Sequence, residues 1–268
     1  MRVAAIQMNS GADVAANLQL ADELIGAAAA GGCKLAVLPE NFALMAAGAR
    51  DKVLHAEQEG HGPIQEFLAD AAHRHALWII AGSMPLVSPD AARVYGACMV
   101  FDAGGHAQGC YRKIHLFDVK LPDRDEAYQE SWSMYPGNDV VTIDTPVGRV
   151  GLTICYDLRF PELFRRLVDD GACVFTVPAA FTTVTGEAHW HALLRARAIE
   201  NLAYVIAPGQ YGTHPDGRST YGHTLICDPW GRILTEQAEG NCVVVADIDL
   251  KLSAKLRSEF PALANRQL

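Results

Sequence analysis

Short apolar runs and longer amphipathic stretches alternate along the whole chain. The apolar runs are bounded by glycine, proline or polar clusters, which is typical of strands buried in a sheet. They predict strands at 2–8, 34–38, 77–82, 95–101, 106–112, 140–143, 150–156, 173–177, 203–207, 221–227 and 242–248. The amphipathic stretches predict helices at 13–30, 63–75, 161–168, 187–201 and from residue 250 onward. The polar segment at 115–138 predicts an irregular loop.

The connections between these elements indicate the fold class. Some predicted strands are joined through a helix, as in parallel βαβ units, whereas 102–105 and 145–148 read as hairpin turns. A further turn at 228–231 is expected between the last two strands. This mixture predicts an α/β fold with a mixed sheet, or two stacked sheets, covered by helices. No linker rich in proline, glycine or serine divides the sequence, so we expect one domain over residues 1–268.

Composition narrows the classes of function. Half of the 268 residues are hydrophobic, which excludes a disordered chain and allows a large core. The 22 basic and 31 acidic residues give a net charge of −9, the wrong sign for a general binder of nucleic acid or anionic membranes. No apolar run is long enough for a membrane helix, and the first residues are too soon polar for a secretory signal. The seven cysteines form no CxxC pair, so we expect reduced thiols in the cytoplasm.

One strand-to-helix junction carries the strongest chemical signal. In the segment 151–162 an apolar strand ends at Cys155, and a helix with Pro161 at its start follows. Free N–H groups at such a helix start favour a thiolate and a nearby oxyanion. Common phosphate, dinucleotide and zinc-protease motifs are absent from the sequence. The pairs His73/His75 and His189/His191 have a spacing that separates the two rings on a helix, so we expect no metal site.

Two further predicted strands end in charged side chains. Glu40 follows the strand at 34–38, and Lys113 follows the strand at 106–112. Functional groups gather beyond the carboxyl ends of strands in open α/β sheets, so these two and Cys155 form a coherent set for acyl transfer. Cys155 would attack, Glu40 would take and return its proton, and Lys113 would stabilise the oxyanion. Taken singly, a buried thiol and solvated charges are the ordinary interpretation of each residue.

Three segments resemble, in this order, the signatures of the nitrilase (carbon–nitrogen hydrolase) superfamily. They are Pro39-Glu40, Tyr111-Arg112-Lys113 and Ile154-Cys155-Tyr156-Asp157. Four longer stretches resemble its branch of Nit amidases and their bacterial relatives, so that the similarity spans nearly the whole chain. These are 111–118 (YRKIHLFD), 155–164 (CYDLRFPELF), 184–200 (VTGEAHWHALLRARAIE) and 221–231 (YGHTLICDPWG).

The resemblance implies an α-β-β-α four-layer sandwich that forms a homodimer or a larger homo-oligomer. It implies that Cys155 is the nucleophile, Glu40 the general base and acid, and Lys113 the oxyanion lysine. A second glutamate of the family, which positions substrate and nucleophile, matches Glu130. Tyr156 would supply a backbone N–H to the oxyanion hole.

The implied reaction is hydrolysis of a terminal carboxamide of a small molecule to carboxylate and ammonia through a cysteine thioester, without a cofactor. The stretches 218–223 and 160–163 resemble enzymes of the deaminated-glutathione type, which repair a metabolite. Their substrate carries carboxylates, and Arg218 is our candidate to bind one. The alternatives are an ω-amidase acting on α-ketoglutaramate or α-ketosuccinamate, a nitrilase, an N-carbamoyl amide hydrolase, a redox-sensing thiol protein and an inactive interaction module.

Overall fold

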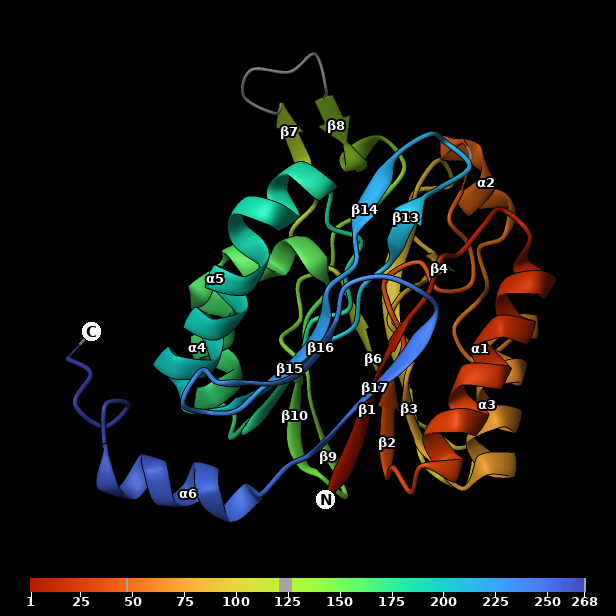
Figure 1. Cartoon of the computed structure of the whole chain (residues 1–268). Coiled ribbons are helices and arrows are strands. Elements are labelled where there is room, and N and C mark those ends of the chain that lie inside the picture. The colour runs from red at the N-terminus through yellow and green to blue at the C-terminus, as the bar shows by residue number, and fades with distance from the viewer. Residues whose placement is uncertain (47, 121–126, 268) are drawn as a thin grey trace.

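The computed structural model describes residues 1–46, 48–120 and 127–267, and in it two β-sheets pack face to face between two layers of helices (Figure 1). The first sheet runs in the order β17 (Cys242–Asp247), β1 (Arg2–Gln7), β2 (Leu35–Val37), β3 (Trp78–Ile80), β5 (Val94–Phe101), β4 (Met84–Val87), with β6 (Ala107–Arg112) also paired to β5. The second runs β16 (Ile233–Gln237), β15 (Thr224–Cys227), β12 (Tyr204–Ala207), β11 (Val174–Thr176), β10 (Gly148–Leu152), β9 (Thr142–Thr145).

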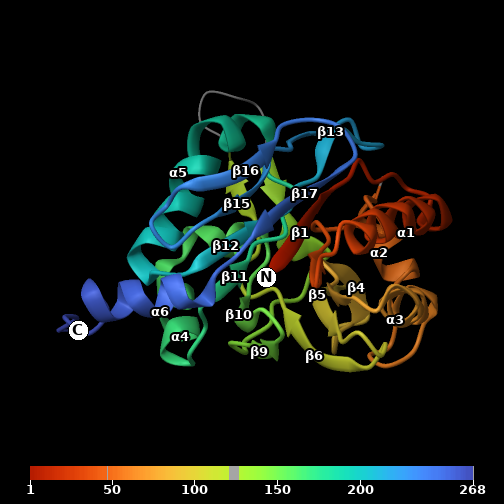
Figure 2. The ribbon, with the colours of Figure 1, turned by 60° about the horizontal axis from the view of Figure 1, so that its bottom comes forward.

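The helices cover the two outer faces of the sheets. Helices α1 (Val14–Ala30) and α3 (Pro63–His75) lie on the first sheet, and α4 (Pro161–Asp169) and α5 (Thr183–Asn201) lie on the second (Figure 1). Helix α2 (Ala49–Leu54) is short, and α6 (Leu250–Glu259) extends from the end of β17 on the same side of the molecule as α4 and α5 (Figure 1 and Figure 2). Two small ribbons pair β7 (Asp118–Lys120) with β8 (Ala127–Gln129) and β13 (Tyr211–Thr213) with β14 (Ser219–Tyr221). The α-β-β-α sandwich expected from the resemblance is confirmed.

Strand β1 shows why the sequence favours this layering. Its side chains alternate between two cores: Val3 and Ala5 face the space between the sheets, whereas Ala4 and Ile6 face α1 and α3. A strand buried on both faces needs apolar residues at every position, which explains the continuous run rather than an alternating one. Among the described residues, no helix is both long and apolar enough to span a membrane.

Several boundaries differ from the sequence prediction. The predicted strand 221–227 is two strands, because Gly222 and His223 both have positive φ, at 69° and 52°, and interrupt the extended backbone between β14 and β15. The turn at 228–231 leads into β16, which we did not predict, before β17 follows. Helix α5 begins at Thr183 rather than at 187, because the Thr182 hydroxyl accepts from the Thr185 N–H and caps the helix.

The predicted loop at 115–138 is also more ordered than expected. It contains β7, β8 and the 3₁₀ helix η1 (Glu130–Trp132), while residues 121–126 of that prediction lie outside the described residues. Strand β4, the ribbon strand β13 and helix α2 were not predicted either. These elements are three to six residues long, too short for a periodic pattern to register.

Strand direction brings three distant segments to one edge. Strands β2 and β3 are parallel, β5 is antiparallel to β3, and β6 is antiparallel to β5, so β2 and β6 run the same way. Glu40 and Lys113 therefore leave the same edge of the first sheet. In the second sheet, β10 and β11 are parallel, so the segments beginning at Thr153 and Val177 also leave one edge. The two edges meet at the candidate site.

Candidate active site

Glu40 lies just beyond β2, where the chain turns sharply. The turn passes so close to Gly82 that a β-carbon there would lie 2.0 Å from the Pro39 carbonyl oxygen. The next residue, Asn41, has a φ of 56°, and its N–H donates to the Ser83 hydroxyl at 2.8 Å. This backbone geometry directs the Glu40 side chain into the protein, where Glu40 is 5% exposed.

Lys113 follows β6, and its backbone N–H donates to the Gly96 carbonyl of β5 at 2.9 Å. Its ammonium group donates to Oε1 of Glu40 at 2.8 Å and to both carboxylate oxygens of Glu130 at 2.9 Å. Glu130 begins η1 and is held in turn by the Phe117 N–H, which donates to Oε2 at 2.7 Å. The three hydrogens of the ammonium are thus all donated to carboxylate oxygens.

Cys155 begins the 3₁₀ helix η2 (Cys155–Arg159), three residues after β10 ends. Its φ of 49° is a left-handed conformation that residues with side chains adopt rarely, and such conformations concentrate at functional sites. The backbone N–H donates to the Pro178 carbonyl at 2.8 Å. The Cys155 thiol and the Glu40 carboxylate influence each other's pKa, and Oε2 of Glu40 accepts from the Ala180 N–H at 2.8 Å.

A buried aspartate ties the turn that holds Cys155 to the segment that holds Lys113. Asp157 accepts from the Tyr111 hydroxyl at 2.7 Å and from the Ile154 N–H at 2.8 Å. It also accepts from the backbone N–H of His115 at 3.1 Å, and its Oδ1 lies 2.7 Å from His115 Nδ1. Because Tyr111 and His115 flank the lysine, this carboxylate fixes the separation of thiol and ammonium.

The charges of the three central groups depend on one another. Burial raises the pKa of Glu40, but the Lys113 ammonium outweighs burial and holds this pKa below its usual value. Burial lowers the pKa of Lys113, but the carboxylates of Glu130 and Glu40 outweigh burial and raise this pKa well above the usual range. Burial and then the charge of Glu40 raise the pKa of Cys155 well above that of a free thiol. The resting site therefore holds a carboxylate, an ammonium group and a neutral thiol.

These groups line one cavity whose wall also includes four aromatic rings. Its rings are those of Phe117, Tyr128, Tyr156 and Phe181. The predicted residue Arg218 also lines this cavity, where it pairs with Asp216. A second hollow adjoins the first and shares four residues with it, namely Tyr128, Thr182, Asp216 and Arg218. The structure thus brings all six residues singled out in the sequence, Glu40, Lys113, Glu130, Cys155, Tyr156 and Arg218, to one cavity.

The sequence profile of one family, described as carbon-nitrogen hydrolase, matches residues 2–258. The chain belongs to this family. It is 41% identical over 266 residues to a deaminated glutathione amidase of Yersinia enterocolitica, covering 99% of this chain and 92% of the relative. It is 37% identical over 271 residues to a human protein of the same name, covering 99% of this chain and 82% of the relative.

A solved structure agrees with this assignment. The crystal structure of Saccharomyces cerevisiae Nit3, a member of branch 10 of the nitrilase superfamily, is 31% identical and superimposes with a TM-score of 0.89. The match covers all of this chain and 97% of that one. The chain is therefore a carbon-nitrogen hydrolase with the nitrilase-superfamily fold, an enzyme that hydrolyses amides.

Two cations in the cavity of this carbon-nitrogen hydrolase were not predicted as site residues. Lys52, on α2, is half-buried, and burial lowers the pKa of its ammonium group. Arg159 ends η2, and its guanidinium lies over the rings of Tyr156 and Phe181 at 5.8 Å and 5.4 Å. Arg159 stands four residues after Cys155, a proximity in sequence that could have identified it. Lys52 had no such signal, because a short polar helix reads as solvated surface.

Proposed function

We propose that this carbon-nitrogen hydrolase cleaves the amide of deaminated glutathione through a thioester on Cys155. The observation that carries the proposal is the convergence of a neutral thiol, a carboxylate and an ammonium group in one cavity that opens into a second hollow. The three groups in the cavity supply a nucleophile with its base and an oxyanion site. The second hollow gives room for a leaving group larger than ammonia. The relatives named deaminated glutathione amidase support the same substrate.

The first step couples attack to proton transfer. Because the pKa of Cys155 is raised and that of Glu40 is lowered, the thiol does not ionise in advance. Its proton passes to Glu40 as the sulfur bonds to the amide carbon, and the carbonyl electron pair moves onto oxygen. A general base held against the thiol performs this transfer without a histidine.

The same proton transfer frees a donor for the oxyanion. At rest Lys113 gives one hydrogen to Glu40 and two to Glu130. Once Glu40 is protonated it is a weaker acceptor, so that hydrogen of Lys113 can turn to the new oxyanion. The backbone N–H of Tyr156, near the start of η2, is the second donor, since the first N–H groups of a helix lack partners within it. Glu130 keeps the ammonium charged and aimed throughout.

Collapse of the tetrahedral intermediate releases the amine. Glu40 returns its proton to the amide nitrogen, the C–N bond breaks, and the acyl group stays on Cys155 as a thioester. Glu40, again a carboxylate, takes a proton from water as the water oxygen bonds to the acyl carbon. The C–S bond then breaks, Glu40 protonates the sulfur, and the product leaves as the acid, which gives its proton to solvent water and becomes a carboxylate.

The chemistry of the substrate refines the expected leaving group. Glutathione is γ-glutamyl-cysteinyl-glycine, so its deaminated form has two secondary amides and no primary carboxamide. Hydrolysis of the γ-amide therefore releases cysteinylglycine and α-ketoglutarate, not the ammonia of the terminal-carboxamide reaction. The acyl group is the same one that an ω-amidase takes from α-ketoglutaramate. The two activities thus differ only on the leaving-group side of the cavity.

The carboxylates of this substrate need cationic partners. Lys52, Arg159 and Arg218 all line the first cavity. Of these, Arg218 also lines the second hollow, and its guanidinium lies 6.0 Å from the ring of Tyr128. We assign the glycine carboxylate of the leaving dipeptide to Arg218, and the α-keto acid carboxylate to Arg159 and Lys52, because a guanidinium or ammonium group suits such anions.

One assay separates the two substrates, because both yield α-ketoglutarate. Release of α-ketoglutarate is measured from deaminated glutathione and from α-ketoglutaramate, with the Cys155→Ala variant as the blank. We expect a higher kcat/KM for deaminated glutathione. In Arg218→Gln we expect a loss of about tenfold or more with that substrate and a much smaller change with α-ketoglutaramate, as for a lost charge-assisted hydrogen bond.

Three other outcomes of this assay would contradict parts of the proposal. A preference for α-ketoglutaramate in the unmodified enzyme would make it an ω-amidase. Equal losses on both substrates in Arg218→Gln would contradict its assignment to the leaving group. Absence of turnover on both substrates would direct the search to nitriles and N-carbamoyl compounds.

We also propose that the enzyme is a homodimer that works in the cytoplasm. Ile199, Trp230 and Phe260 are large exposed apolar residues; the Ile199 side chain lies beside Gly231, and the rings of Trp230 and Phe260 are 5.6 Å apart. Such a patch suits a subunit contact, so Trp230→Ser should lower the mass measured by light scattering. All seven cysteines are free thiols, which suits a reducing compartment and keeps Cys155 reactive.

A further inference from the structure

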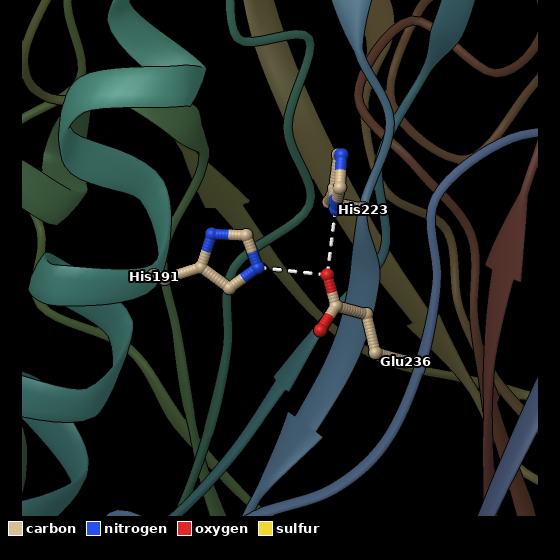
Figure 3. A group of neighbouring side chains, drawn as sticks. All are labelled: His191, His223 and Glu236. Carbon is tan, nitrogen blue, oxygen red and sulfur yellow. Dashed lines mark hydrogen bonds and ion pairs between the residues drawn. The ribbon is translucent and has the colours of Figure 1, made fainter.

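Outside the cavity, three side chains with metal-binding atoms converge. His191 comes from α5, His223 from the junction between β14 and β15, and Glu236 from β16 (Figure 3). One ring nitrogen of each histidine and a carboxylate oxygen all lie within 4.8 Å of one another. None of the three lines the active-site cavity or the hollow beside it.

The two imidazole rings both contact the same carboxylate oxygen atom. Oε1 of Glu236 lies 2.7 Å from Nε2 of His191 and 2.6 Å from Nδ1 of His223 (Figure 3). The hydrogen bonds from these histidines outweigh the effect of burial and hold the pKa of Glu236 below its usual value. The group therefore presents one carboxylate and two imidazoles toward a common point.

His223 has a strained backbone conformation, and its neighbours hold it in place. Its φ of 52° is left-handed, although histidine has a side chain. Its carbonyl accepts from the indole N–H of Trp190 at 2.8 Å, and its N–H donates to the Ala238 carbonyl at 3.0 Å. The ring stacks on Tyr221 with centroids 4.0 Å apart and planes inclined by 18°. A strained conformation held by several partners is typical of a functional position.

We propose that His191, His223 and Glu236 bind one divalent transition-metal ion, with Zn²⁺ as the representative. Two imidazole nitrogens and one carboxylate oxygen are ligands for Zn²⁺, Co²⁺, Ni²⁺ and Cu²⁺ rather than for Mg²⁺ or Ca²⁺, which prefer oxygen alone. The three side chains are 27–31% exposed, so an ion can enter and water can complete its coordination.

A rearrangement on the order of 1 Å separates the hydrogen-bonded group from a metal site, because its three ligand atoms already lie within 4.8 Å of one another. Metal–ligand distances of about 2.0–2.2 Å in a tetrahedron place neighbouring ligand atoms about 3.4 Å apart. The carboxylate of Glu236 must therefore withdraw by less than about 1 Å from each imidazole. The two N–H hydrogens that now point at Glu236 move to the other ring nitrogens, so that lone pairs face the ion.

The proposed ion would join parts of the second sheet to the helix that covers it. His191 lies in the middle of α5, whose N-terminal end supplies Thr185 to the active-site cavity. Glu236 lies on the edge strand β16. A metal ion that joins these elements would restrain α5 at a point outside the active-site cavity. The role is structural, and the hydrolytic mechanism needs no contribution from it.

The test is an isothermal titration calorimetry experiment in which zinc is added to full-length protein. This protein carries Cys155→Ser, which removes the reactive thiol as a competing ligand. We expect one equivalent to bind, and the affinity to fall at least tenfold in His191→Gln and in Glu236→Gln. His106→Gln is the matched control, because His106 and Asp102 form a histidine–carboxylate pair that has no third ligand among the described residues. His223→Asn is a further variant that tolerates the left-handed backbone.

Co²⁺ serves as a spectroscopic probe of the same site. We expect visible d–d bands without a sulfur-to-cobalt charge-transfer band, and we expect zinc to raise Tm in the parent protein but not in His191→Gln. Unchanged zinc affinity in His191→Gln and Glu236→Gln, or a sulfur charge-transfer band, would overturn the assignment. Circular dichroism and Tm of each metal-free variant show whether it is folded. Absence of binding by the folded parent protein would also overturn the proposal.

Discussion

Replacing Glu40 by glutamine should make Cys155 more acidic and yet the enzyme less active. The charge of Glu40 is one of the causes that raise the pKa of the Cys155 thiol, while Lys113 lowers this pKa. Removing the charge leaves the effect of the ammonium unopposed by Glu40, so the pKa of the thiol falls. The fraction of thiolate at neutral pH rises. A nucleophile that ionises more readily should therefore accompany slower hydrolysis.

The expected loss of activity follows from the two tasks of Glu40. In the proposed mechanism it removes the thiol proton and later protonates the leaving nitrogen. General acid–base catalysis contributes about 10²–10⁴-fold per group, or roughly 3–5 kcal/mol of barrier. We therefore expect kcat to fall at least about a hundredfold. Lys113 remains paired with Glu130, so the free energy of unfolding should change much less than the barrier.

Two measurements on the same preparation test this reasoning. The first is α-ketoglutarate release under steady-state conditions. The second is the rate of alkylation of Cys155 by iodoacetamide across pH, with the modified peptide identified by mass spectrometry. The matched control is Glu40→Asp, which keeps the charge but shortens its reach. It should keep the alkylation profile near that of the parent while still slowing hydrolysis.

The opposite shift would refute the electrostatic account. If the alkylation profile of Glu40→Gln stays where it is or moves to higher pH, the Glu40 charge does not hold the thiol neutral. If hydrolysis falls less than tenfold, Glu40 is not the base.

Cys155→Ala should abolish turnover without loss of Tm, as measured by product release and thermal melts; detectable thioester chemistry would contradict the assignment. Lys113→Met should lower kcat about a hundredfold or more. It should also cost about 3–5 kcal/mol of unfolding free energy, because the buried carboxylate of Glu40 and the half-buried one of Glu130 lose their cation. Denaturant titrations at two pH values should show this cost shrinking on acidification, because burial raises the pKa of Glu40 once Lys113 no longer opposes it, so that Glu40 takes up a proton; an undiminished cost would oppose this explanation. Tyr111→Phe should cost about 1.5–3 kcal/mol of unfolding free energy by removing one hydrogen bond to the buried Asp157 carboxylate, with kcat reduced less than tenfold; a larger loss of kcat would show that this hydrogen bond sets the position of Lys113 relative to Cys155.

Glu40, Lys113 and Cys155 could be found from sequence because each follows an apolar strand that the pattern reveals clearly. Strand order, however, depends on pairings between distant segments. The sequence did not indicate by itself that β6 runs parallel to β2 and so places Lys113 beside Glu40. The resemblance to a family supplied the sandwich, and the observed layers confirm it.

Glu130 is a site residue that the hydrophobic pattern of the sequence does not identify. It lies in a polar stretch without periodicity and was identified only through the resemblance, yet both its oxygens bind Lys113. Lys52 was missed because α2 has six residues, too few to show a helical period. His223 was overlooked because its backbone conformation, which splits a predicted strand, depends on contacts with Trp190 and Ala238 that lie outside its local sequence.

The pairing of β1 with β17 has a consequence for how the protein is made. Arg2 and Asp247 are neighbours in the sheet although 245 positions separate them along the chain. A ribosome adds about 5–20 residues per second, so β17, which pairs with the edge of β1, is synthesised many seconds after β1. Throughout that interval the nascent chain presents an apolar strand with unpaired N–H and C=O groups, which is a template for aggregation. Production of this enzyme should therefore respond strongly to chaperones that bind nascent chains and to slower growth at low temperature.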